Sequence, residues 1–122
     1  MLFAKFEEVN RSVVKTLLAI SDVIETFMED YPDAVVYLFG SCARGQATGS
    51  SDVDIAIITP KSLGWRERSR FSACYDTSKE VNFTYILRED FDVLDLPLYS
   101  DIRRDGVLWE KLVTDLPKLK ED

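Results

Sequence analysis

The first quarter of the chain carries apolar residues at intervals of three and four. These positions are Phe6, Val9, Val13, Leu17, Ile20, Ile24 and Phe27. Such spacing predicts one face of a long amphipathic helix that packs against a core. The helix is expected to end at Tyr31-Pro32, because proline disfavours helical geometry in the residue before it.

Three short segments further along have the patterns of β-strands. Residues 34–39 form a continuous apolar run, which is typical of a strand buried on both faces. A second strand is predicted from Asp52 to Thr59, where Pro60 follows. In Glu80–Leu87 apolar and polar residues alternate, which predicts a third strand with one face toward the core.

Helices are predicted between and after these strands. Residues 62–77, which include Cys74 and Tyr75, have the pattern of an amphipathic helix, and another helix is expected to begin at Arg88. Residues 96–112 are expected to form one or two short helices or turns. This order of elements predicts a single domain over the whole chain, with an α/β (α+β) fold in which helices flank a short mixed sheet.

Composition limits the classes of function. A formal net charge of -7 weighs against direct nucleic-acid binding, because such binding relies on Lys and Arg that displace counterions from phosphates. The basic residues Arg66, Arg68 and Arg70 are typical of a solvated helix face. Cys42 and Cys74 lack the spacing of a zinc site, and the chain has no histidine, so the usual histidine-assisted metal and catalytic sites are excluded.

The cellular location is inferred from the cysteines and from the apolar runs. Two cysteines without a disulfide framework suggest a reducing compartment, and a cytoplasmic location is therefore expected. No apolar run approaches the ~20 residues of a membrane span, so no membrane association is expected.

Two carboxylates stand at the start of the second predicted strand. Asp52 and Asp54 are two residues apart, so they project from one face of the strand with their backbones about 7 Å apart. Carboxylates held together repel each other, and Mg²⁺ is a natural partner because it bridges protein carboxylates to substrate phosphates. An isolated pair of this kind more often has no such role, so the neighbouring residues decide.

Those neighbours include Gly40-Ser41, at the end of the first predicted strand. Glycine lets the backbone approach a ligand closely, and a serine hydroxyl donates to phosphate oxygens. A short helix is predicted to begin at Cys42, and its first amides would favour an anion. Arg44 on this helix either reaches the same phosphates or is an ordinary surface arginine.

Residues 38–45 (LFGSCARG) and 51–57 (SDVDIAI) together resemble the signature of the DNA polymerase β-like nucleotidyltransferase superfamily, in its minimal nucleotidyltransferase (MNT) branch. The resemblance implies that fold, with Mg²⁺ held by Asp52 and Asp54. It also implies that Gly40 and Ser41 bind the phosphates of an NTP, expected to be ATP, with Arg44 and Ser51 as further nucleotide-binding candidates. Such proteins transfer a nucleoside monophosphate to a hydroxyl and release pyrophosphate.

One position departs from the family pattern. The third catalytic carboxylate of the family comes from the next strand, and Asn82 occupies that place here. An amide supplies an oxygen but neither a charge nor a proton acceptor. Glu80 lies on the same strand face and is the candidate to compensate, although its side chain would have to recover about 7 Å. Nucleotide binding is therefore expected more strongly than full catalysis.

Three functions remain open at this point. The first is AMP transfer to a partner protein, as in MNT antitoxins that pair with HEPN-type toxins. The second is a catalytically inactive nucleotide- or partner-binding module, which Asn82 favours. The third is a transferase for an aminoglycoside-like metabolite, which would need a second subunit. Trp65, Leu98 and Trp109 are the apolar residues considered for an interface in a homo-oligomer, although core or rim packing is the commoner use.

Overall fold

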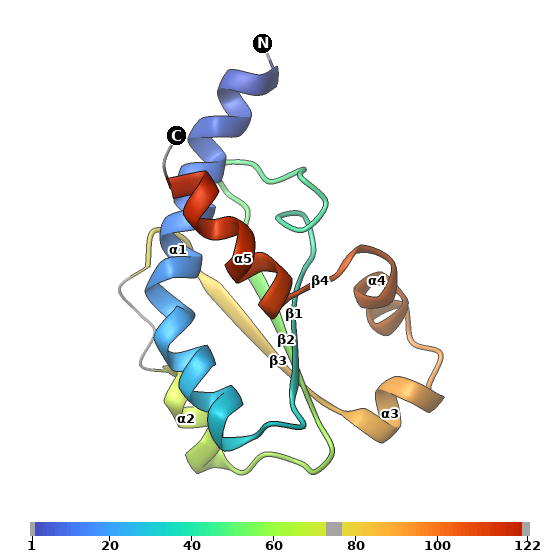
Figure 1. The fold of residues 1–122 in the computed structure, drawn as a ribbon. Helices are drawn as coiled ribbons and strands as arrows, with labels where there is room; N and C mark the ends of the chain where they lie inside the picture. The colour runs from blue at the N-terminus through green and yellow to red at the C-terminus, as the bar shows by residue number, and fades with distance from the viewer. Residues whose placement is uncertain (1, 73–76, 121–122) are drawn as a thin grey trace.

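The computed structural model describes residues 2–72 and 77–120, with side chains described for residues 11–72 and 77–114. Figure 1 shows the arrangement of the helices and strands. In chain order these are α1 (Leu2–Asp30), β1 (Val35–Phe39), β2 (Val53–Thr59), α2 (Trp65–Ser72), β3 (Val81–Leu87), α3 (Arg88–Val93), α4 (Pro97–Asp105), β4 (Val107–Leu108) and α5 (Trp109–Lys120).

The strands form one four-stranded mixed sheet in the order β3-β2-β1-β4. β1 pairs antiparallel with β2 and β4, whereas β2 and β3 run parallel. The registers place Phe39 opposite Asp54, and Asp54 opposite Asn82. The end of β1 therefore lies beside the beginnings of β2 and β3, which brings the predicted site residues to one end of the sheet.

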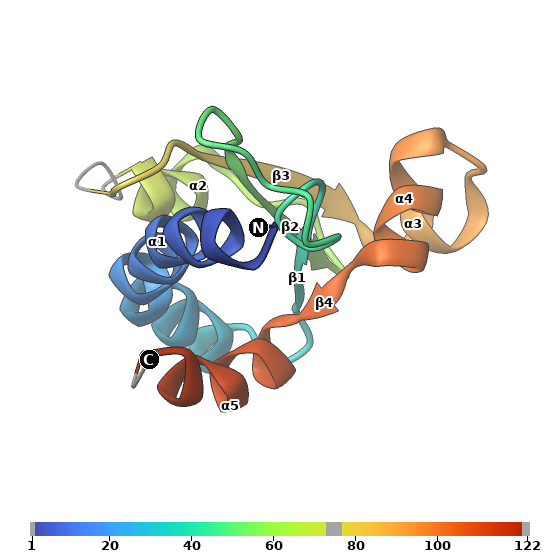
Figure 2. The same cartoon turned by 90° about the horizontal axis from the view of Figure 1, so that it is seen from above.

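One face of the sheet is covered by α1, α2 and α5 (Figures 1 and 2). From Val13 to Phe27 the predicted apolar stripe of α1 supplies buried side chains, and alternate residues of β1 and β2 meet them from the sheet. The side chains of Phe6 and Val9 lie outside the described residues. Phe71 of α2 and Trp109 of α5 close the two sides of this core. Burial of the stripe, and not helix propensity alone, is thus what stabilises α1.

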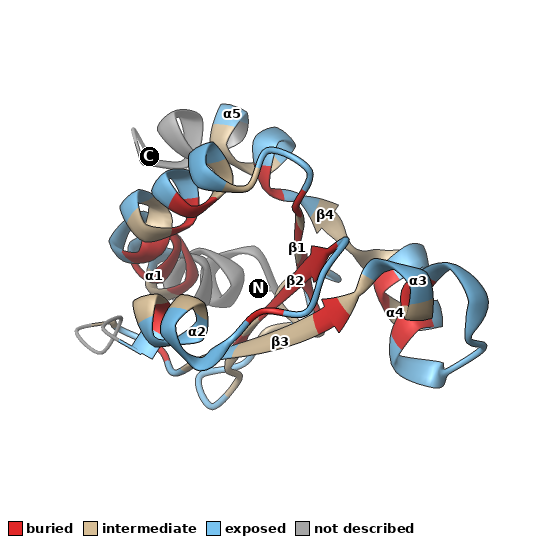
Figure 3. Cartoon of the chain, turned by 90° about the horizontal axis from the view of Figure 1, so that it is seen from below, coloured by how far each residue is buried: buried red, intermediate tan, exposed pale blue. Residues whose placement is uncertain are grey.

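The opposite face is only partly covered. Phe91 of α3 and Tyr99 and Ile102 of α4 form a second core cluster with residues of β1 and with the later residues of β2 and β3. Figure 3 shows these two helices grouped beside the end of β3. Nearer the start of both strands, Asp54 is half-buried and Asn82 is exposed. This open half of the face carries the predicted chemistry.

The sequence-based elements are confirmed with shifted boundaries. The helix predicted over residues 62–77 is observed as α2, and Cys74 and Tyr75 lie outside the described residues. β2 begins at Val53 rather than Asp52, so Asp52 belongs to the preceding loop. β4 was not predicted, because a two-residue strand exists only through its pairing with β1.

Two tryptophans considered for an interface have opposite environments. Trp109 is 1% exposed and belongs to the core, whereas Trp65 is 75% exposed. No helix among residues 2–72 and 77–120 combines the length and apolar character needed to cross a bilayer.

Candidate active site

The turn after β1 depends on glycine. Gly40 has a left-handed backbone with φ of 77°. A Cβ atom at this position would lie 2.5 Å from Oδ2 of Asp54, closer than non-bonded atoms approach. Only glycine therefore lets β1 end this close to the Asp54 carboxylate.

Residues 41–46 form a single helical turn, and the prediction of a short helix from Cys42 was wrong. The Gln46 N–H donates to the Ser41 carbonyl at 2.9 Å, and the Gly45 N–H donates to the Cys42 carbonyl at 3.4 Å. With Gly45 at a φ of 70°, these two bonds make a Schellman motif, which ends a helix. The helix therefore stops after one turn.

Asn82 connects the two carboxylates. Its Nδ2 donates to Oδ2 of Asp52 at 3.1 Å and to Oδ1 of Asp54 at 3.4 Å. The structure thus brings together the three residues predicted to be catalytic, next to Gly40. Asn82 acts here as a donor, whereas a carboxylate in its place would act as an acceptor.

Burial raises the pKa of the Asp54 carboxyl above its ordinary value. The hydrogen bond from Asn82 opposes this increase, the negative charge of Asp52 adds to it, and the guanidinium of Arg44 opposes it. A half-buried carboxylate next to a second carboxylate gains most from a nearby positive charge. The electrostatics of the cluster therefore favour a bound cation.

Arg44 is exposed and lies between the turn and the end of α4. Its Nε donates to Oε1 of Gln46 at 3.1 Å, and its guanidinium lies 3.8 Å from Oδ2 of Asp105. The contact with Asp105 directs the side chain toward α4. Exposed contacts of this kind are worth at most about 1 kcal/mol, so a phosphate can compete for the guanidinium.

Ser51 helps to shape the loop that leads to Asp52. Its Oγ accepts the Thr48 N–H at 2.8 Å, and its own N–H donates to the Thr48 carbonyl at 3.1 Å. The hydroxyl is therefore already used within the loop, and its contact with nucleotide stays a prediction.

Lys79 supports the same loop, and the sequence analysis missed it. This lysine is only 7% exposed, and its Nζ donates to the carbonyls of Ser51, Thr48 and Gly49 at 2.8, 3.0 and 3.4 Å. Its backbone N–H donates to Oγ1 of Thr16, which is fully buried in α1, at 3.0 Å. A buried ammonium is tolerated when such acceptors satisfy it. Lys79 thus connects α1 to the loop before Asp52.

The donors of the cluster fit one magnesium ion bound together with phosphates. Asp52 and Asp54 offer carboxylate oxygens, and Mg²⁺ is commonly held by one or two carboxylates with water and substrate phosphates. Among the described residues, no group of three or more acidic, cysteine or histidine side chains is arranged to hold a metal ion. This agrees with asparagine at position 82.

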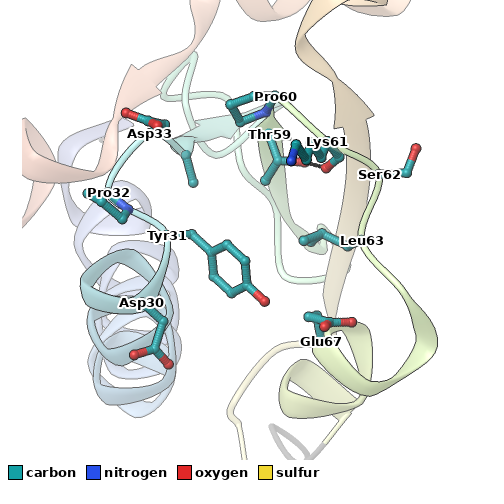
Figure 4. Close-up of a pocket in the computed structure, with 11 residues that line it drawn as sticks. Asp30, Tyr31, Pro32, Asp33, Thr59, Pro60, Lys61, Ser62, Leu63 and Glu67 are labelled. Carbon is teal, nitrogen blue, oxygen red and sulfur yellow. Dashed lines mark hydrogen bonds between the residues drawn. The ribbon is translucent and has the colours of Figure 1, made fainter.

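A separate cavity of about 410 Å³ opens at the other end of the strands. It is lined by residues 30–34, residues 59–63 and Glu67, and the ring of Tyr31 is directed into it (Figure 4). These segments precede β1 and follow β2, whereas the carboxylate cluster follows β1 and precedes β2. The cavity is therefore not part of the candidate active site.

The sequence matches the family model of the nucleotidyltransferase domain over residues 20–115. This match spans most of the chain, and the protein therefore belongs to the nucleotidyltransferase domain family. The nucleotidyltransferase family that was predicted from the sequence is thus confirmed, and the minimal branch of that family stays a prediction. No curated protein matches the chain in sequence.

Several solved structures align with the chain. A Sulfolobus solfataricus protein assigned as a nucleotidyltransferase aligns with a TM-score of 0.56 at 23% identity, covering 83% of this chain and 85% of that chain. A toxin–antitoxin complex with AMP-PNP gives a TM-score of 0.48 at 19% identity, with coverage of 82% and 83%. The complex of tri-AMPylated Shewanella oneidensis HEPN toxin with MNT antitoxin gives 0.45 at 17% identity, with coverage of 87% and 84%. At 23% identity the likeness to the Sulfolobus solfataricus protein concerns the fold alone.

Proposed function

We propose that residues 1–122 act as one minimal nucleotidyltransferase domain that binds Mg-ATP and transfers AMP to a hydroxyl of a partner protein. The observation that carries the proposal is the cluster of Asp52, Asp54 and Asn82 beside the glycine turn. In this cluster Nδ2 of Asn82 lies 3.1 and 3.4 Å from the carboxylate oxygens of Asp52 and Asp54. Membership of the nucleotidyltransferase family supports the same reaction.

Each residue of the site has a distinct part in this proposal. Asp52 and Asp54 would hold Mg²⁺, which supplies charge neutralisation for the phosphates. Gly40 leaves room for the triphosphate beside Asp54, Ser41 donates its hydroxyl to a phosphate oxygen, and Arg44 adds positive charge.

The transfer forms a bond between the acceptor oxygen and the α-phosphorus, and it breaks the bond between that phosphorus and the bridging oxygen of pyrophosphate. The proton of the acceptor hydroxyl passes to a carboxylate of the pair or to water, because the Asn82 amide does not accept a proton. The lack of a base at position 82 predicts slow transfer.

A HEPN-type toxin is the partner class implied by the resemblance in sequence. The open half of the sheet face around Asn82 is consistent with an acceptor that another protein supplies, since α3 and α4 leave it uncovered. The test is incubation with α-labelled ATP, Mg²⁺ and a co-expressed HEPN protein, and the expected result is label on the HEPN protein. Nucleotide binding without label on any such partner would count against transfer.

Asn82 also favours a second function, that of a nucleotide-gated module without catalysis. The hydrogen bonds from its amide to both carboxylates offset part of the repulsion between Asp52 and Asp54, whereas a third carboxylate would add to that repulsion. A stable site that holds nucleotide but transfers nothing is the outcome of such an arrangement.

Replacing Asn82 with aspartate separates the two functions. Asn82→Asp is expected to raise the rate of AMP transfer by roughly 10²- to 10⁴-fold, which is the usual contribution of a positioned base. Glu80→Gln is the companion variant, because it removes the carboxylate that could compensate in the wild type. Equal transfer by wild type and Asn82→Asp, with a loss in Glu80→Gln, would show that Glu80 already serves as the third carboxylate.

Replacing Gly40 tests the glycine turn. Gly40→Ala is expected to weaken Mg-ATP binding about tenfold, because the methyl group displaces Asp54 and a left-handed L-residue costs roughly 1–2 kcal/mol. Gly49→Ala is the matched control, since no atom lies within 4 Å of a Cβ at that position. Isothermal titration measures both affinities, and equal affinities would contradict a close approach of phosphate to Gly40.

A further inference from the structure

Exposed apolar side chains are concentrated where α3 meets α4. Among the described residues seven large apolar side chains are exposed, and four of the seven lie within residues 93–98. These four are Val93, Leu94, Leu96 and Leu98, with exposed fractions of 75%, 43%, 42% and 38%. Single exposed apolar residues are ordinary, whereas a group of them marks an interaction site. Residues 93–98 are called the α3–α4 corner below.

The corner is held in place by the residues on either side of it. Phe91 and Tyr99 are buried in the second core cluster, and the centres of their rings lie 5.5 Å apart. Figures 1 and 2 show α3 and α4 beside the end of β3, on the opposite side of the sheet from α1. The core thus holds both ends of the corner, and the corner itself is left at the surface.

Carboxylates without a partner surround the apolar side chains of the corner. Among the described residues no ion pair or side-chain hydrogen bond involves Glu89, Asp90, Asp92 or Asp95. Arg88 is the basic residue of the same stretch. The corner therefore has an excess of negative charge.

The arginines of α4 do not neutralise this excess. Arg104 pairs with Asp101 at 2.9 Å and with Asp105 at 3.0 Å. The guanidinium of Arg103 lies 4.5 Å from the centre of the Phe91 ring. Both arginines thus have contacts of their own, and neither forms an ion pair with a carboxylate of residues 89–95.

We propose that the α3–α4 corner binds a basic amphipathic helix of a partner protein. The apolar stripe of this helix covers the exposed side chains of the corner, and its Lys and Arg residues pair with Asp92 and Asp95. The corner consists of two helix ends and the connection between them, so it offers side chains to a partner rather than a free strand edge. An amphipathic helix carries an apolar stripe flanked by charges, which matches an apolar segment flanked by carboxylates.

The negative charge argues against the other occupants of an apolar surface. A second copy in a symmetric dimer would bring the same carboxylates together across the contact. Anionic lipids and nucleic-acid phosphates would meet the same repulsion. A basic partner is the occupant that gains from both the apolar side chains and the charge.

The corner lies on the same side of the sheet as the carboxylate cluster. Asp54 projects from the same face of β2 as Ala56 and Ile58, and these two residues pack in one cluster with Phe91 and Tyr99. A partner bound at the corner would therefore lie over the face that carries Asp54. Docking itself needs neither nucleotide nor metal, so a failure of docking and a failure of the proposed AMP transfer are separate results.

The probe is a fluorescein-labelled peptide of about 18 residues, with leucine at intervals of three and four and lysine at the other positions, so that it forms an amphipathic helix. The control peptide has glutamate in place of lysine. Fluorescence anisotropy is expected to show binding of the lysine peptide only. Amide chemical shifts are expected to change within residues 88–105, which comprise α3, the corner and α4.

Two apolar substitutions test the contact with the stripe. Val93→Gln/Leu96→Gln should weaken binding by roughly tenfold or more, because two central apolar contacts are lost. Leu18→Gln/Trp65→Gln is the matched control, since it changes two exposed apolar residues on α1 and α2. This control should bind the peptide as wild type does.

Two charge substitutions test the pairing with lysine. Asp92→Asn/Asp95→Asn should weaken binding by about threefold or more at low salt, and the difference from wild type should shrink as salt is added. Asp22→Asn/Glu25→Gln removes two exposed carboxylates of α1 instead, and it should bind as wild type does. All of these substitutions are at exposed positions, and circular dichroism checks that the fold is kept.

The proposal fails if the lysine peptide does not bind at millimolar concentration or if the glutamate peptide binds equally well. It also fails if Val93→Gln/Leu96→Gln binds as wild type does, or if the shifts lie outside residues 88–105. Sedimentation that shows a dimer lost in the same variant would assign the corner to a second copy instead. Tighter association with phosphatidylcholine vesicles than with the peptide would assign it to a membrane.

Discussion

Replacing Asp54 with asparagine is expected to weaken Mg-ATP binding by roughly a hundredfold. Removing a residue that only supports a metal ligand already lowers metal affinity by about 10- to 100-fold, so loss of a ligand itself should reach the upper end of this range. The carboxylate is a proposed metal ligand, and Asn82 already fills the third position with an amide. Because burial raises the pKa of Asp54, its charged form is disfavoured in the fold. A neutral amide of the same shape should therefore leave the melting temperature unchanged or higher.

The matched control for this variant is Asp33→Asn. Asp33 is an exposed carboxylate at the other end of β1, so the chemical change is the same and the site is remote. Isothermal titration with and without a chelator measures affinity, and calorimetry measures the melting temperature. If Asp54→Asn retained wild-type affinity and the chelator had no effect, nucleotide would have to bind without a metal at this cluster.

Replacing Lys79 with methionine is expected to lower the free energy of unfolding by about 2 kcal/mol. The substitution keeps the length of the side chain but removes the charged donor from three carbonyl groups, and hydrogen bonds to charged groups are worth about 1.5–3 kcal/mol. The loop before Asp52 should also become looser. Faster amide exchange in residues 48–52 and weaker Mg-ATP binding are the corresponding results.

Lys111→Met is the control, because Lys111 is exposed on α5 and the substitution removes the same charge. Urea unfolding gives the free-energy difference between the two variants. A difference within about 0.5 kcal/mol would mean that water replaces the ammonium at the three carbonyls, and that the loop keeps its shape without Lys79.

The elements that the sequence predicted well are those specified by local patterns. The stripe of α1 and the apolar runs of β1 and β2 depend on neighbouring residues only, so their periodicity is visible in one dimension. β4 could not be predicted in this way, since two residues become a strand only where Tyr37 and Leu38 of β1 are beside them. The helix at Cys42 was overpredicted because the left-handed conformation of Gly45 was not considered.

The same distinction applies to the candidate site. Asp52, Asp54 and Asn82 were predictable together because the family signature fixes their spacing, and the parallel register then brings them into contact. Lys79 was not predictable, because the carbonyls that it binds lie 28 to 31 residues earlier in the chain. A lysine next to serine and glutamate looks like any solvated surface residue until the fold brings the loop to it.

The register between β2 and β3 also has a genetic consequence. Asn82 already stands opposite Asp54, and aspartate has nearly the same shape as asparagine. The codons of these two amino acids differ only in their first base. A single point mutation is therefore sufficient to exchange a neutral donor for a negative acceptor at this position, without any rearrangement of the backbone around it.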